Sequence, residues 1–330
     1  MKRFVARQTG RKLVTGCAGF LGSQLAERLV GQGHEVIGVD CFTDFYDRSM
    51  KEQNLARLMD EPGFAFRELD LSVDPLAAVL EGVDVAYHLA GQPGVRGSFG
   101  GNMAVYLRNN VRASSRLLDE AARWPVHRIV YASSSTVYGN VGDAPTPETA
   151  GRRPLSPYGL TKVMTEDLAA IHFKRAGLPA VGLRYFSAYG PRQRPDLAMR
   201  RFIESALEDR PITITGTGNQ QRDFTYVDDM LDATTAAGAV GRPGSVYNIG
   251  GGSPYRLLEV VMAIEELTGR TLEKNFVNAA SGDAASTNAD NTRATEDLGF
   301  APRTSLRDGL EAQLEWTLAT AAPARRLLAA

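Results

Sequence analysis

Residues 11–22 read RKLVTGCAGFLG, and this stretch decides the fold. A short apolar run ends at Gly16, and Gly19 and Gly22 follow at the spacing GxxGxxG. Beyond them, residues 21–30 have the pattern of an amphipathic helix. Glycine lets a strand turn sharply into a helix and lets the two elements pack closely. The stretch therefore predicts a strand, a tight turn and a helix, which is the start of a parallel sheet.

The same glycines predict a dinucleotide site. A backbone without Cβ atoms can approach a pyrophosphate, and the first turn of a helix offers unpaired N–H groups. Asp40 lies at the end of the next predicted strand, 18 residues after Gly22. A carboxylate there accepts hydrogen bonds from an unmodified ribose and repels a 2′-phosphate, so NAD is favoured over NADP. Asp70 and Leu71 end the third strand where an adenine edge can be read, although an aspartate there also serves as a cap.

Apolar, β-branched runs recur along the chain with helical patterns between them. Further strands are expected at 35–39, 65–69, 83–88, 128–132, 180–183 and 246–249, and later helices at 257–267 and 306–316. Strands that alternate with helices require parallel crossovers and helices on both faces of the sheet. We expect an α/β fold, a doubly wound parallel Rossmann sheet with a smaller interleaved C-terminal substrate-binding lobe. The Rossmann domain is expected at 11–185 plus about 224–250 and the second lobe at about 186–223 plus 251–320, with 1–10 and 321–330 flexible.

Composition narrows the class of protein. The 330 residues fit about two domains, and 37 basic against 38 acidic residues leave a net charge of −1, which argues against a nucleic-acid binder. Cys17 and Cys41 are too few for a disulfide framework. No stretch has the length of a membrane span or the apolar core of a secretory signal. The four histidines lack ligand spacing, so no metal is expected. These features favour the cytoplasm, with both cysteines reduced and lining the adenosine side of the NAD site.

A second motif lies at residues 156–162, SPYGLTK. Ser156 is the expected N-cap and Pro157 the first residue of a helix. Tyr158 and Lys162 are four residues apart, so a phenol and an ammonium group share one helix face. The pair suits proton transfer, although the same spacing also occurs by accident on surface helices.

Seven motifs, which follow one another along the chain, resemble those of the extended short-chain dehydrogenases. Within that family they are similar to the NAD-dependent nucleotide-sugar epimerase and dehydratase group. The resemblance covers about residues 12–310, and its motifs are GCAGFLG at 16–22, HLAGQ at 88–92, NNV at 109–111, ASSSTVYG at 132–139, YGLTK at 158–162, RYFSAYGPRQRP at 184–195 and QRDFTYVDD at 221–229. It implies a catalytic triad of Ser134, Tyr158 and Lys162. The cofactor contacts it implies are Gly16, Gly19, Phe20, Leu21, Gly22, Asp40, Cys41, Asp70, Leu71, Leu89, Ala90, Gln92, Asn110, Ser133, Tyr158, Lys162 and Tyr185.

Within this family, the residue types directly after Ser134 distinguish the enzymes that catalyse different reactions. Dehydratases carry Asp-Glu at the positions of Ser135 and Thr136, and glucuronate decarboxylases carry Glu at the Thr136 position. Hydroxyl groups do not transfer protons at useful pKa values. The resemblance therefore implies 4-epimerisation through a 4-keto sugar, with tightly bound NAD regenerated in each cycle. A non-catalytic NAD-binding regulator is the alternative from another class.

The substrate is expected to be a UDP-sugar. Relatives that act on glucuronate resemble this chain at 42–55 and 190–198, whereas relatives that act on glucose usually carry Asn in place of Ser187. UDP-glucuronate, converted to UDP-galacturonate, is thus expected ahead of UDP-glucose, and a dTDP-sugar stays open. An arginine fork suits the C6 carboxylate, with Arg194 the first choice and Arg192 the second; Ser135 and Thr136 are expected to assist.

The diphosphate is expected to contact Arg222 and, less securely, Arg96. After Gly282 and Asp283, where relatives often carry an arginine, the chain has Ala284-Ala285-Ser286, so Arg293 is a possible substitute. By analogy with the family, the chain forms a homodimer through helices near 102–123 and 158–175.

Overall fold

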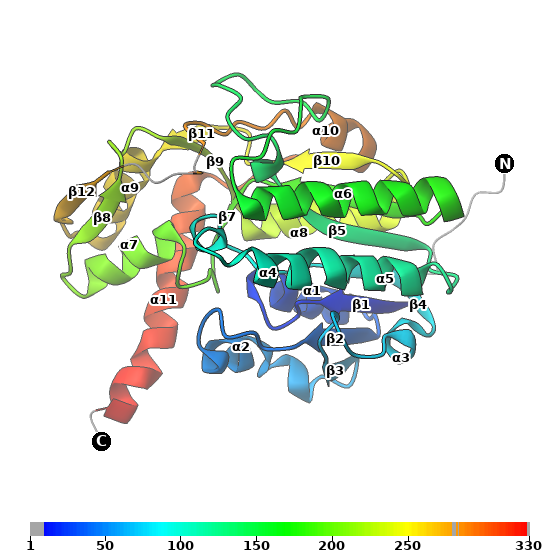
Figure 1. Ribbon diagram of the computed structural model, residues 1–330. Helices are drawn as coiled ribbons and strands as arrows, with labels where there is room; N and C mark the ends of the chain where they lie inside the picture. The colour runs from blue at the N-terminus through cyan, green and yellow to red at the C-terminus, as the bar shows by residue number, and fades with distance from the viewer. Residues whose placement is uncertain (1–9, 279–281, 283, 329–330) are drawn as a thin grey trace.

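The computed structural model describes residues 10–278, 282 and 284–328. Its centre is a parallel sheet of seven strands in the order β10-β6-β5-β4-β1-β2-β3 (Figure 1). The strands are β1 (Arg11–Thr15), β2 (Val36–Asp40), β3 (Phe64–Glu68), β4 (Val83–His88), β5 (Arg128–Ser134), β6 (Ala180–Tyr185) and β10 (Val246–Ile249). This order reverses beside β1, where a doubly wound sheet opens a crevice for ligands. The predicted fold class is confirmed.

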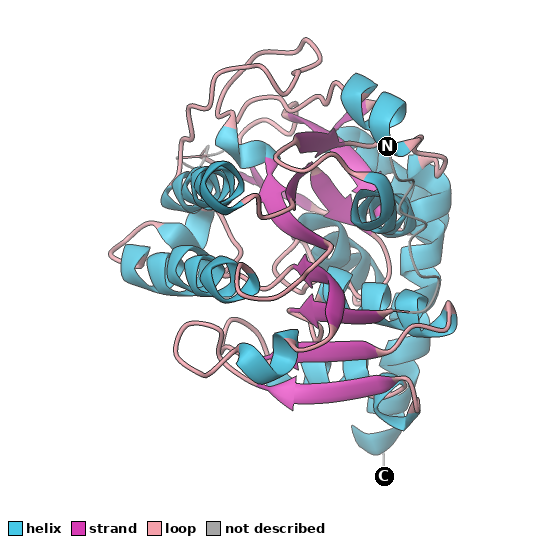
Figure 2. Cartoon of the chain, turned by 90° about the vertical axis from the view of Figure 1, so that its right-hand side faces the viewer, coloured by secondary structure: helices cyan, strands magenta, loops and turns pink. Residues whose placement is uncertain are grey.

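Helices cover both faces of the sheet (Figures 1 and 2). One face packs against α1 (Phe20–Gly31) and α8 (Val227–Val240), with Leu25, Leu29, Met230 and Ala237 in the core. The other face packs against α3 (Ala77–Leu80), α5 (Ala113–Ala121) and α6 (Pro157–Ala176). Short elements link these layers: α2 (Arg48–Leu55), α4 (Met103–Tyr106) and the 3₁₀ turns at Leu58–Asp60, Arg96–Ser98 and Ser135–Val137.

A smaller lobe has its own core beside the carboxyl ends of the strands. A three-stranded sheet contains β7 (Ser187–Tyr189), β9 (Gln221–Tyr226) and β11 (Pro254–Arg256), and β8 (Ile212–Thr215) pairs with β12 (Lys274–Val277). Around them lie α7 (Ala198–Leu207), α9 (Leu257–Thr268) and α11 (Leu306–Leu328). The lobe is interleaved, because the chain returns to the large sheet through α8 and β10.

One boundary at the C-terminal end needs a correction. Helix α10 (Thr292–Leu298) falls in the range expected for the smaller lobe, but Ala294 and Leu298 are buried in the core of the large sheet. The last helix, α11, includes the helix expected at 306–316 and continues to Leu328. The expectation of a flexible segment at 1–9 lies outside the described residues.

The predicted helix at 102–123 is interrupted by a π-helical segment at Leu107–Arg112. Such segments are frequent at functional sites because they re-aim side chains. Here the segment carries Asn110, whose side chain is buried. Asn110 Oδ1 accepts from Gln92 N at 2.6 Å, and its Nδ2 donates to Thr161 Oγ1 at 2.9 Å. One amide thus fastens the loop after β4 to helix α6.

His88, at the end of β4, gives the fold an acid-sensitive element. Both ring nitrogens are hydrogen-bonded, Nδ1 with Thr15 Oγ1 at 2.8 Å and Nε2 with Ser114 Oγ at 2.9 Å. Burial lowers the pKa of His88 to about 3, with a further contribution from the charge of Lys162. The neutral ring is therefore part of the folded state.

We expect stability to fall as the pH drops below about 6.5, the pKa of an unfolded histidine. Between this value and the folded pKa of about 3, the unfolded chain binds the proton more readily. The contribution of His88 is at most about 1.4 kcal/mol per pH unit. Urea denaturation at pH 7.5 and 5.0 should show a shallower pH dependence in His88→Gln than in the parent. Equal slopes in the two proteins would contradict this role.

Candidate active site

The glycine-rich turn forms a cradle at the end of β1. Gly16 has a φ of +73°, and a Cβ there would lie 2.8 Å from Ala90 N. At Gly22 a Cβ would lie 2.0 Å from Gly16 O. Helix α1 starts after Gly19, which provides no side-chain cap, so the N–H groups of its first turn, including those of Phe20 and Leu21, have no cap acceptor. This backbone fits a pyrophosphate, as the sequence predicts.

Asp40 reaches over this turn from the end of β2. Its Oδ2 accepts from Ala18 N at 3.1 Å and its Oδ1 accepts from Phe42 N at 2.9 Å. Burial raises the pKa of Asp40, and these two N–H donors act in the opposite direction. Asn54, on α2, adds a contact that the sequence did not reveal, because its Nδ2 donates to Ala18 O at 3.0 Å. The carboxylate is thus held at the glycine turn, where a ribose of NAD would lie.

The loop after β4 forms the opposite wall of the cradle. Leu89 N donates to Thr15 O at 3.2 Å, and Ala90 N donates to Thr15 Oγ1 at 3.2 Å. Gln92 is buried and held by Asn110. Leu89, Ala90 and Gln92 thus lie in one loop that is fastened to the end of β1 and to Asn110.

Four expected cofactor contacts have side chains directed elsewhere. The Asp70 carboxylate accepts from Ser72 N and pairs with Arg108, so it acts as a cap. The Leu71 side chain is buried in the core between the sheet and α5. Ser133 Oγ donates to Glu166, and Tyr185 Oη is paired with Thr234 Oγ1. Strand alternation explains the directions of the Ser133 and Tyr185 side chains, since neighbouring side chains of a strand point to opposite faces.

The cysteines also differ from the expectation that both line the adenosine side. Cys17 is 0% exposed, and its Sγ lies 2.8 Å from the place where a Cβ of Gly38 would be. Burial raises the pKa of Cys17 well above its usual value and raises that of Cys41 to about 11. Only Cys41 keeps partial exposure. Alkylation of Cys17 is thus slowed by the fold itself and is no measure of NAD binding.

The three expected catalytic residues come from two elements that approach closely. Ser134 ends β5, and its Oγ accepts from Thr136 Oγ1 at 2.9 Å. Helix α6 begins as predicted, with Ser156 Oγ accepting from Gly159 N at 3.1 Å. A Cβ on Gly159 would lie only 2.8 Å from Thr136 O, so glycine lets the helix meet the turn after β5.

Lys162 and Tyr158 then lie next to each other on α6. Lys162 is 7% exposed, and its Nζ donates to Ala132 O at 2.8 Å. The same nitrogen lies 5.8 Å from the centre of the Tyr158 ring. Tyr106 packs edge-on against that ring, with 6.3 Å between centroids. The Lys162 nitrogen and the Tyr158 phenol thus lie side by side, which suits a site of proton exchange.

Arg194 lies on the rim of this site. A chain of contacts leads from it to Tyr158: its guanidinium lies 5.8 Å from the centre of the Phe45 ring. Phe45 and Tyr106 Oη both pack on Gly94, within 3.3 and 3.4 Å of its would-be Cβ. Arg194 donates to the Asp196 carboxylate with two bonds, at 2.9 and 3.0 Å. Its fork is thus engaged by a carboxylate of its own loop.

Arg192, the second choice for the sugar carboxylate, is directed away from the site. Its φ is +63°, which turns the side chain toward α1. There Nη2 donates to Glu27 Oε1 at 2.8 Å and Nη1 to Ser23 Oγ at 3.2 Å. Gln24 Nε2 also donates to Pro191 O at 3.0 Å. Arg192 therefore fastens the loop of Arg194 to the helix of the glycine cradle, and its guanidinium is engaged there.

A cavity of about 780 Å³ lies in the smaller lobe. Arg222 lines it, as do residues 215–217, 219–221 and 284–286 and Asn140, which follows Thr136 closely in the chain. The sequence missed Arg256, which lies on β11 and lines the same cavity. Arg293, proposed as a substitute, instead donates to Val246 O on the large sheet. Two guanidinium groups on one cavity suit an anionic ligand such as a diphosphate.

The remaining expected residues lie near these features. Ser187 begins β7, in register with Phe224 of β9, and is partly exposed. Arg96 lies in the exposed turn at Arg96–Ser98, and Ser135 is partly exposed beside Ser134. Among residues 10–278, 282 and 284–328, no three His, Cys, Asp or Glu side chains gather as a metal site. Nor does any helix in that part of the chain have the length and apolarity to cross a membrane.

With this geometry in place, comparison with known proteins gives the class. The model of the NAD dependent epimerase/dehydratase family matches residues 12–250, and the chain belongs to that family. It is 42% identical over 308 residues to a protein described as an uncharacterized UDP-glucose epimerase, YtcB, of Bacillus subtilis, covering 92% of this chain and 96% of that one. A dTDP-glucose 4,6-dehydratase of Streptomyces griseus is 34% identical over 309 residues, covering 93% and 94%.

Among solved structures, the chain is similar to a UDP-glucuronic acid 4-epimerase of Bacillus cereus in complex with UDP-glucuronic acid and NAD. The TM-score is 0.91 at 38% identity, covering 94% of this chain and 99% of that one. These relatives differ in reaction and in sugar, so the residues of the site must distinguish between them.

Proposed function

We propose that this protein is an NAD-dependent UDP-sugar 4-epimerase that interconverts UDP-glucuronate and UDP-galacturonate. The observation that carries the proposal is the similarity to the Bacillus cereus enzyme, at 38% identity and a TM-score of 0.91. Arg194, which lies near Phe45 and pairs with Asp196, is the residue that we propose exchanges Asp196 for the sugar carboxylate. The cavity lined by Arg222 and Arg256 supports a nucleoside diphosphate as the other half of that substrate.

The glycine cradle and Asp40 would hold NAD. The chemistry it would supply is reversible hydride transfer, in which hydride leaves C4 of the sugar and returns to the opposite face of the sugar. Tyr158 exchanges a proton with the 4-hydroxyl group, and Ser134 Oγ donates a hydrogen bond to that oxygen. Lys162, fixed to Ala132 O, keeps positive charge beside the phenol. Because the cofactor is restored in every cycle, the purified protein is expected to contain NAD.

The hydroxyl groups after Ser134 favour epimerisation over the other reactions of the family. A dehydratase needs an acid and a base near C5 and C6, and Ser135 and Thr136 provide neither. Thr136 Oγ1 is also engaged with Ser134 Oγ. A 4-keto glucuronate is a β-keto acid, which loses carbon dioxide when its C5–C6 bond aligns with the carbonyl π system. An arginine that holds the carboxylate opposes that alignment.

Replacement of Arg194 tests the substrate. Arg194→Ala should lower kcat/KM for UDP-glucuronate about 10- to 100-fold more than for UDP-glucose, because a charged hydrogen-bonding partner contributes about 1.5–3 kcal/mol. Arg194→Lys keeps the charge without the fork, so its kcat/KM for UDP-glucuronate should lie between the values of the parent and of Arg194→Ala. Exposed Arg201→Ala serves as the matched control. Equal losses on both sugars would contradict the assignment of Arg194 while leaving the epimerase chemistry intact.

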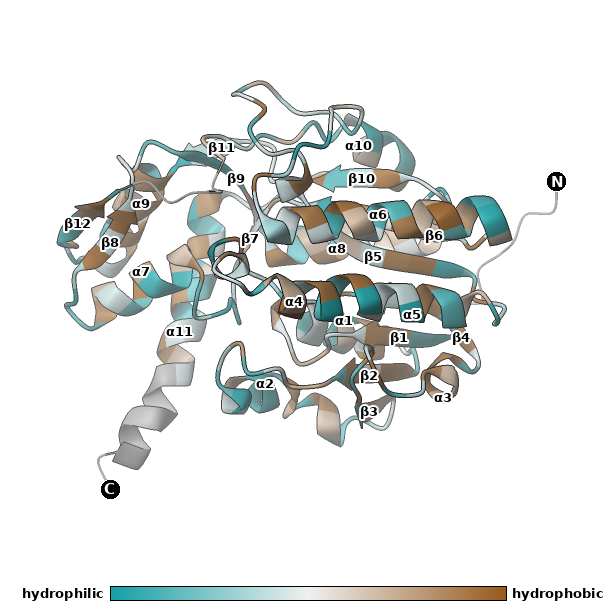
Figure 3. Cartoon of the chain, in the orientation of Figure 1, coloured by the Kyte–Doolittle hydropathy of each residue, from teal (hydrophilic) through white to brown (hydrophobic). Residues whose placement is uncertain are grey.

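We also propose a homodimer through α4, α5 and α6. Helices α4 and α6 and the π segment carry exposed large apolar side chains: Val105, Leu107, Leu160, Met164, Ile171 and Phe173. The ribbon of this region has brown, hydrophobic bands in Figure 3. Ile171 is 56% exposed. A second copy would cover this face by packing the same helices against it. Sedimentation velocity should show a dimer in the parent and a monomer after Ile171→Glu with Leu160→Glu; a parent monomer at micromolar concentration would contradict the proposal.

We further propose that the protein is located in the reducing environment of the cytoplasm. The two free cysteines support this location.

A further inference from the structure

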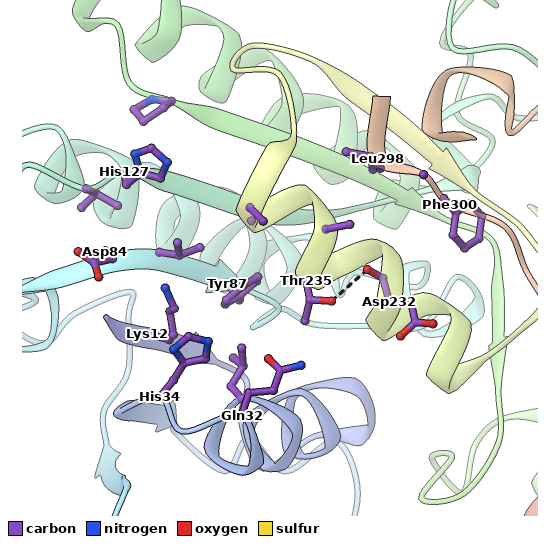
Figure 4. Close-up of a pocket in the computed structure, with 18 of the residues that line it drawn as sticks. Lys12, Gln32, His34, Asp84, Tyr87, His127, Asp232, Thr235, Leu298 and Phe300 are labelled. Carbon is purple, nitrogen blue, oxygen red and sulfur yellow. Dashed lines mark hydrogen bonds between the residues drawn. The ribbon is translucent and has the colours of Figure 1, made fainter. Parts of the chain in front are cut away.

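Opposite charges meet in a cavity of about 1210 Å³ at the amino-terminal ends of β1 and β4, away from the glycine cradle (Figure 4). Burial lowers the pKa of Lys12 there, and the charge of Asp84 opposes this, so the ammonium group has a negative charge beside it and calls for no further anion. The ion pair of Arg194 and Asp196 differs from this balanced pair, because it lies on the rim of the proposed substrate site.

A carboxylate of the protein fills the Arg194 fork. Arg194 Nε and Nη2 donate to the two carboxylate oxygens of Asp196, at 2.9 and 3.0 Å. The two side chains are only 20% and 35% exposed. Within residues 10–278, 282 and 284–328, the guanidinium contacts the Phe45 ring and has no other hydrogen-bonding partner. Asp196 therefore occupies the place that a ligand carboxylate would take on this arginine.

The backbone that carries this pair is held by its neighbours. Gln193 is 3% exposed, and its Oε1 accepts from Gln313 Nε2 of α11 at 2.8 Å. Arg192 fastens the same loop to α1. Because the backbone beside Arg194 is fixed, a change of partner at the fork requires movement of the Asp196 side chain alone.

Both charges of the pair act on tyrosines of the site. Burial raises the pKa of Tyr46 to about 12, and the charges of Arg194 and Asp196 act on it in opposite directions. Burial also raises the pKa of Tyr106, where the same two charges again oppose each other. Tyr106 packs edge-on against the Tyr158 ring. The pair is thus close enough to respond to a charge that arrives beside Tyr158.

A charged and a neutral sugar affect this pair differently. One guanidinium fork binds one carboxylate with two bonds, and two neighbouring carboxylates repel each other. A sugar with a carboxylate must therefore displace Asp196 to reach Arg194. A sugar with a hydroxymethyl group in that place leaves the pair intact, so Arg194 keeps its counterion. Asp196 thus opposes the binding of the charged sugar and not that of the neutral one.

We infer that Asp196 is an internal competitor of the sugar carboxylate and sets the selectivity of the site between charged and neutral sugars. The inference rests on the proposed function, in which Arg194 binds that carboxylate. Binding exchanges one ion pair for another and involves no covalent step. The displaced Asp196 carboxylate turns to solvent, to which it is already 35% exposed.

Calorimetric titration with UDP-glucuronate and UDP-glucose tests the inference. The Tyr158→Phe protein, as purified, serves as the background, because it is expected to bind both ligands without converting them. Adding Asp196→Asn should tighten binding of UDP-glucuronate about three- to tenfold, the range for loss of a partly exposed competing ion pair. The affinity for UDP-glucose should stay the same or fall, because Arg194 then lacks a counterion in that complex.

Two further variants in this background keep the result specific. Arg194→Ala with Asp196→Asn should bind both ligands like Arg194→Ala alone, because the competitor then has no fork to occupy. Asp209→Asn removes an aspartate that pairs with Arg270 on the surface, and it should match the background.

The outcomes separate this inference from the proposed function. If Asp196→Asn weakens binding of UDP-glucuronate as Arg194→Ala does, Asp196 positions the arginine and does not compete, and the inference is wrong. Unchanged affinities in Asp196→Asn would also overturn it, although Arg194 would remain the ligand. If Arg194→Ala leaves the selectivity unchanged, the assignment of Arg194 in the proposed function fails, and the inference fails with it.

Discussion

Replacement of Tyr158 by phenylalanine is expected to abolish epimerisation, with kcat reduced about 10²- to 10⁴-fold, the range for loss of a general acid–base group. The ring would still pack against Tyr106, and Lys162 would keep its bond to Ala132 O, so the fold and the NAD cradle should be preserved. Only the group that exchanges a proton with the 4-hydroxyl is removed. Steady-state kinetics on UDP-glucuronate, together with NAD content from absorbance after denaturation, measures both effects.

The neighbouring tyrosine provides a matched control. Tyr106 Oη donates to the backbone carbonyls of Pro93 and Gly94, at 2.9 and 2.8 Å, so it has a structural partner already. Tyr106→Phe should therefore lower kcat less than about tenfold. It should also lower the free energy of unfolding by about 1 kcal/mol. A Tyr158→Phe protein with activity within tenfold of the parent would exclude Tyr158 as the proton carrier.

Loss of the Glu166 charge is expected to produce the largest change in stability. Glu166 is 3% exposed and lies one turn after Lys162 on α6. It accepts from Arg184 Nε at 2.8 Å and Nη2 at 2.7 Å, and from Ser133 Oγ at 2.5 Å. Glu166→Ala leaves the buried Arg184 guanidinium without its counterion, which costs about 3–5 kcal/mol. Urea denaturation should show this as a lower midpoint.

An exposed pair calibrates that experiment. Glu266 pairs with Arg307 at 3.1 Å, with both side chains at least 60% exposed. Glu266→Ala should change stability by no more than about 1 kcal/mol, because water screens the pair. Replacing both Glu166 and Arg184 by leucine and methionine should recover part of the loss. If Glu166→Ala lowers the free energy of unfolding no more than Glu266→Ala does, the buried network does not hold β5, β6 and α6 together.

The sequence predicted the elements whose signals are local. The strands at 83–88 and 246–249 have the predicted bounds, because each is a compact apolar run. Helix α6 begins as expected because Ser156 and Pro157 specify its first turn. The glycine cradle followed from GxxGxxG in the same way, since only glycine fits backbone approaches of this kind.

The features that the sequence missed depend on contacts between distant segments. The direction of Arg192 is set by a positive φ and by Glu27 on another helix, and no local pattern reveals either. Arg256 joins Arg222 only because β11 pairs with β9. Strand alternation is the one local signal among these, since it indicates that Ser133 and Ser134 face opposite sides of β5.

Proton NMR of UDP-glucuronate incubated with the purified protein, without added NAD or reductant, tests 4-epimerisation itself. The anomeric signal of UDP-galacturonate should grow until the two epimers reach equilibrium. Under the same conditions UDP-glucose should react much more slowly. A UDP-pentose would show that the protein decarboxylates its intermediate, a faster reaction with UDP-glucose would identify a glucose epimerase, and an unchanged spectrum from protein that contains NAD would contradict enzymatic epimerisation altogether.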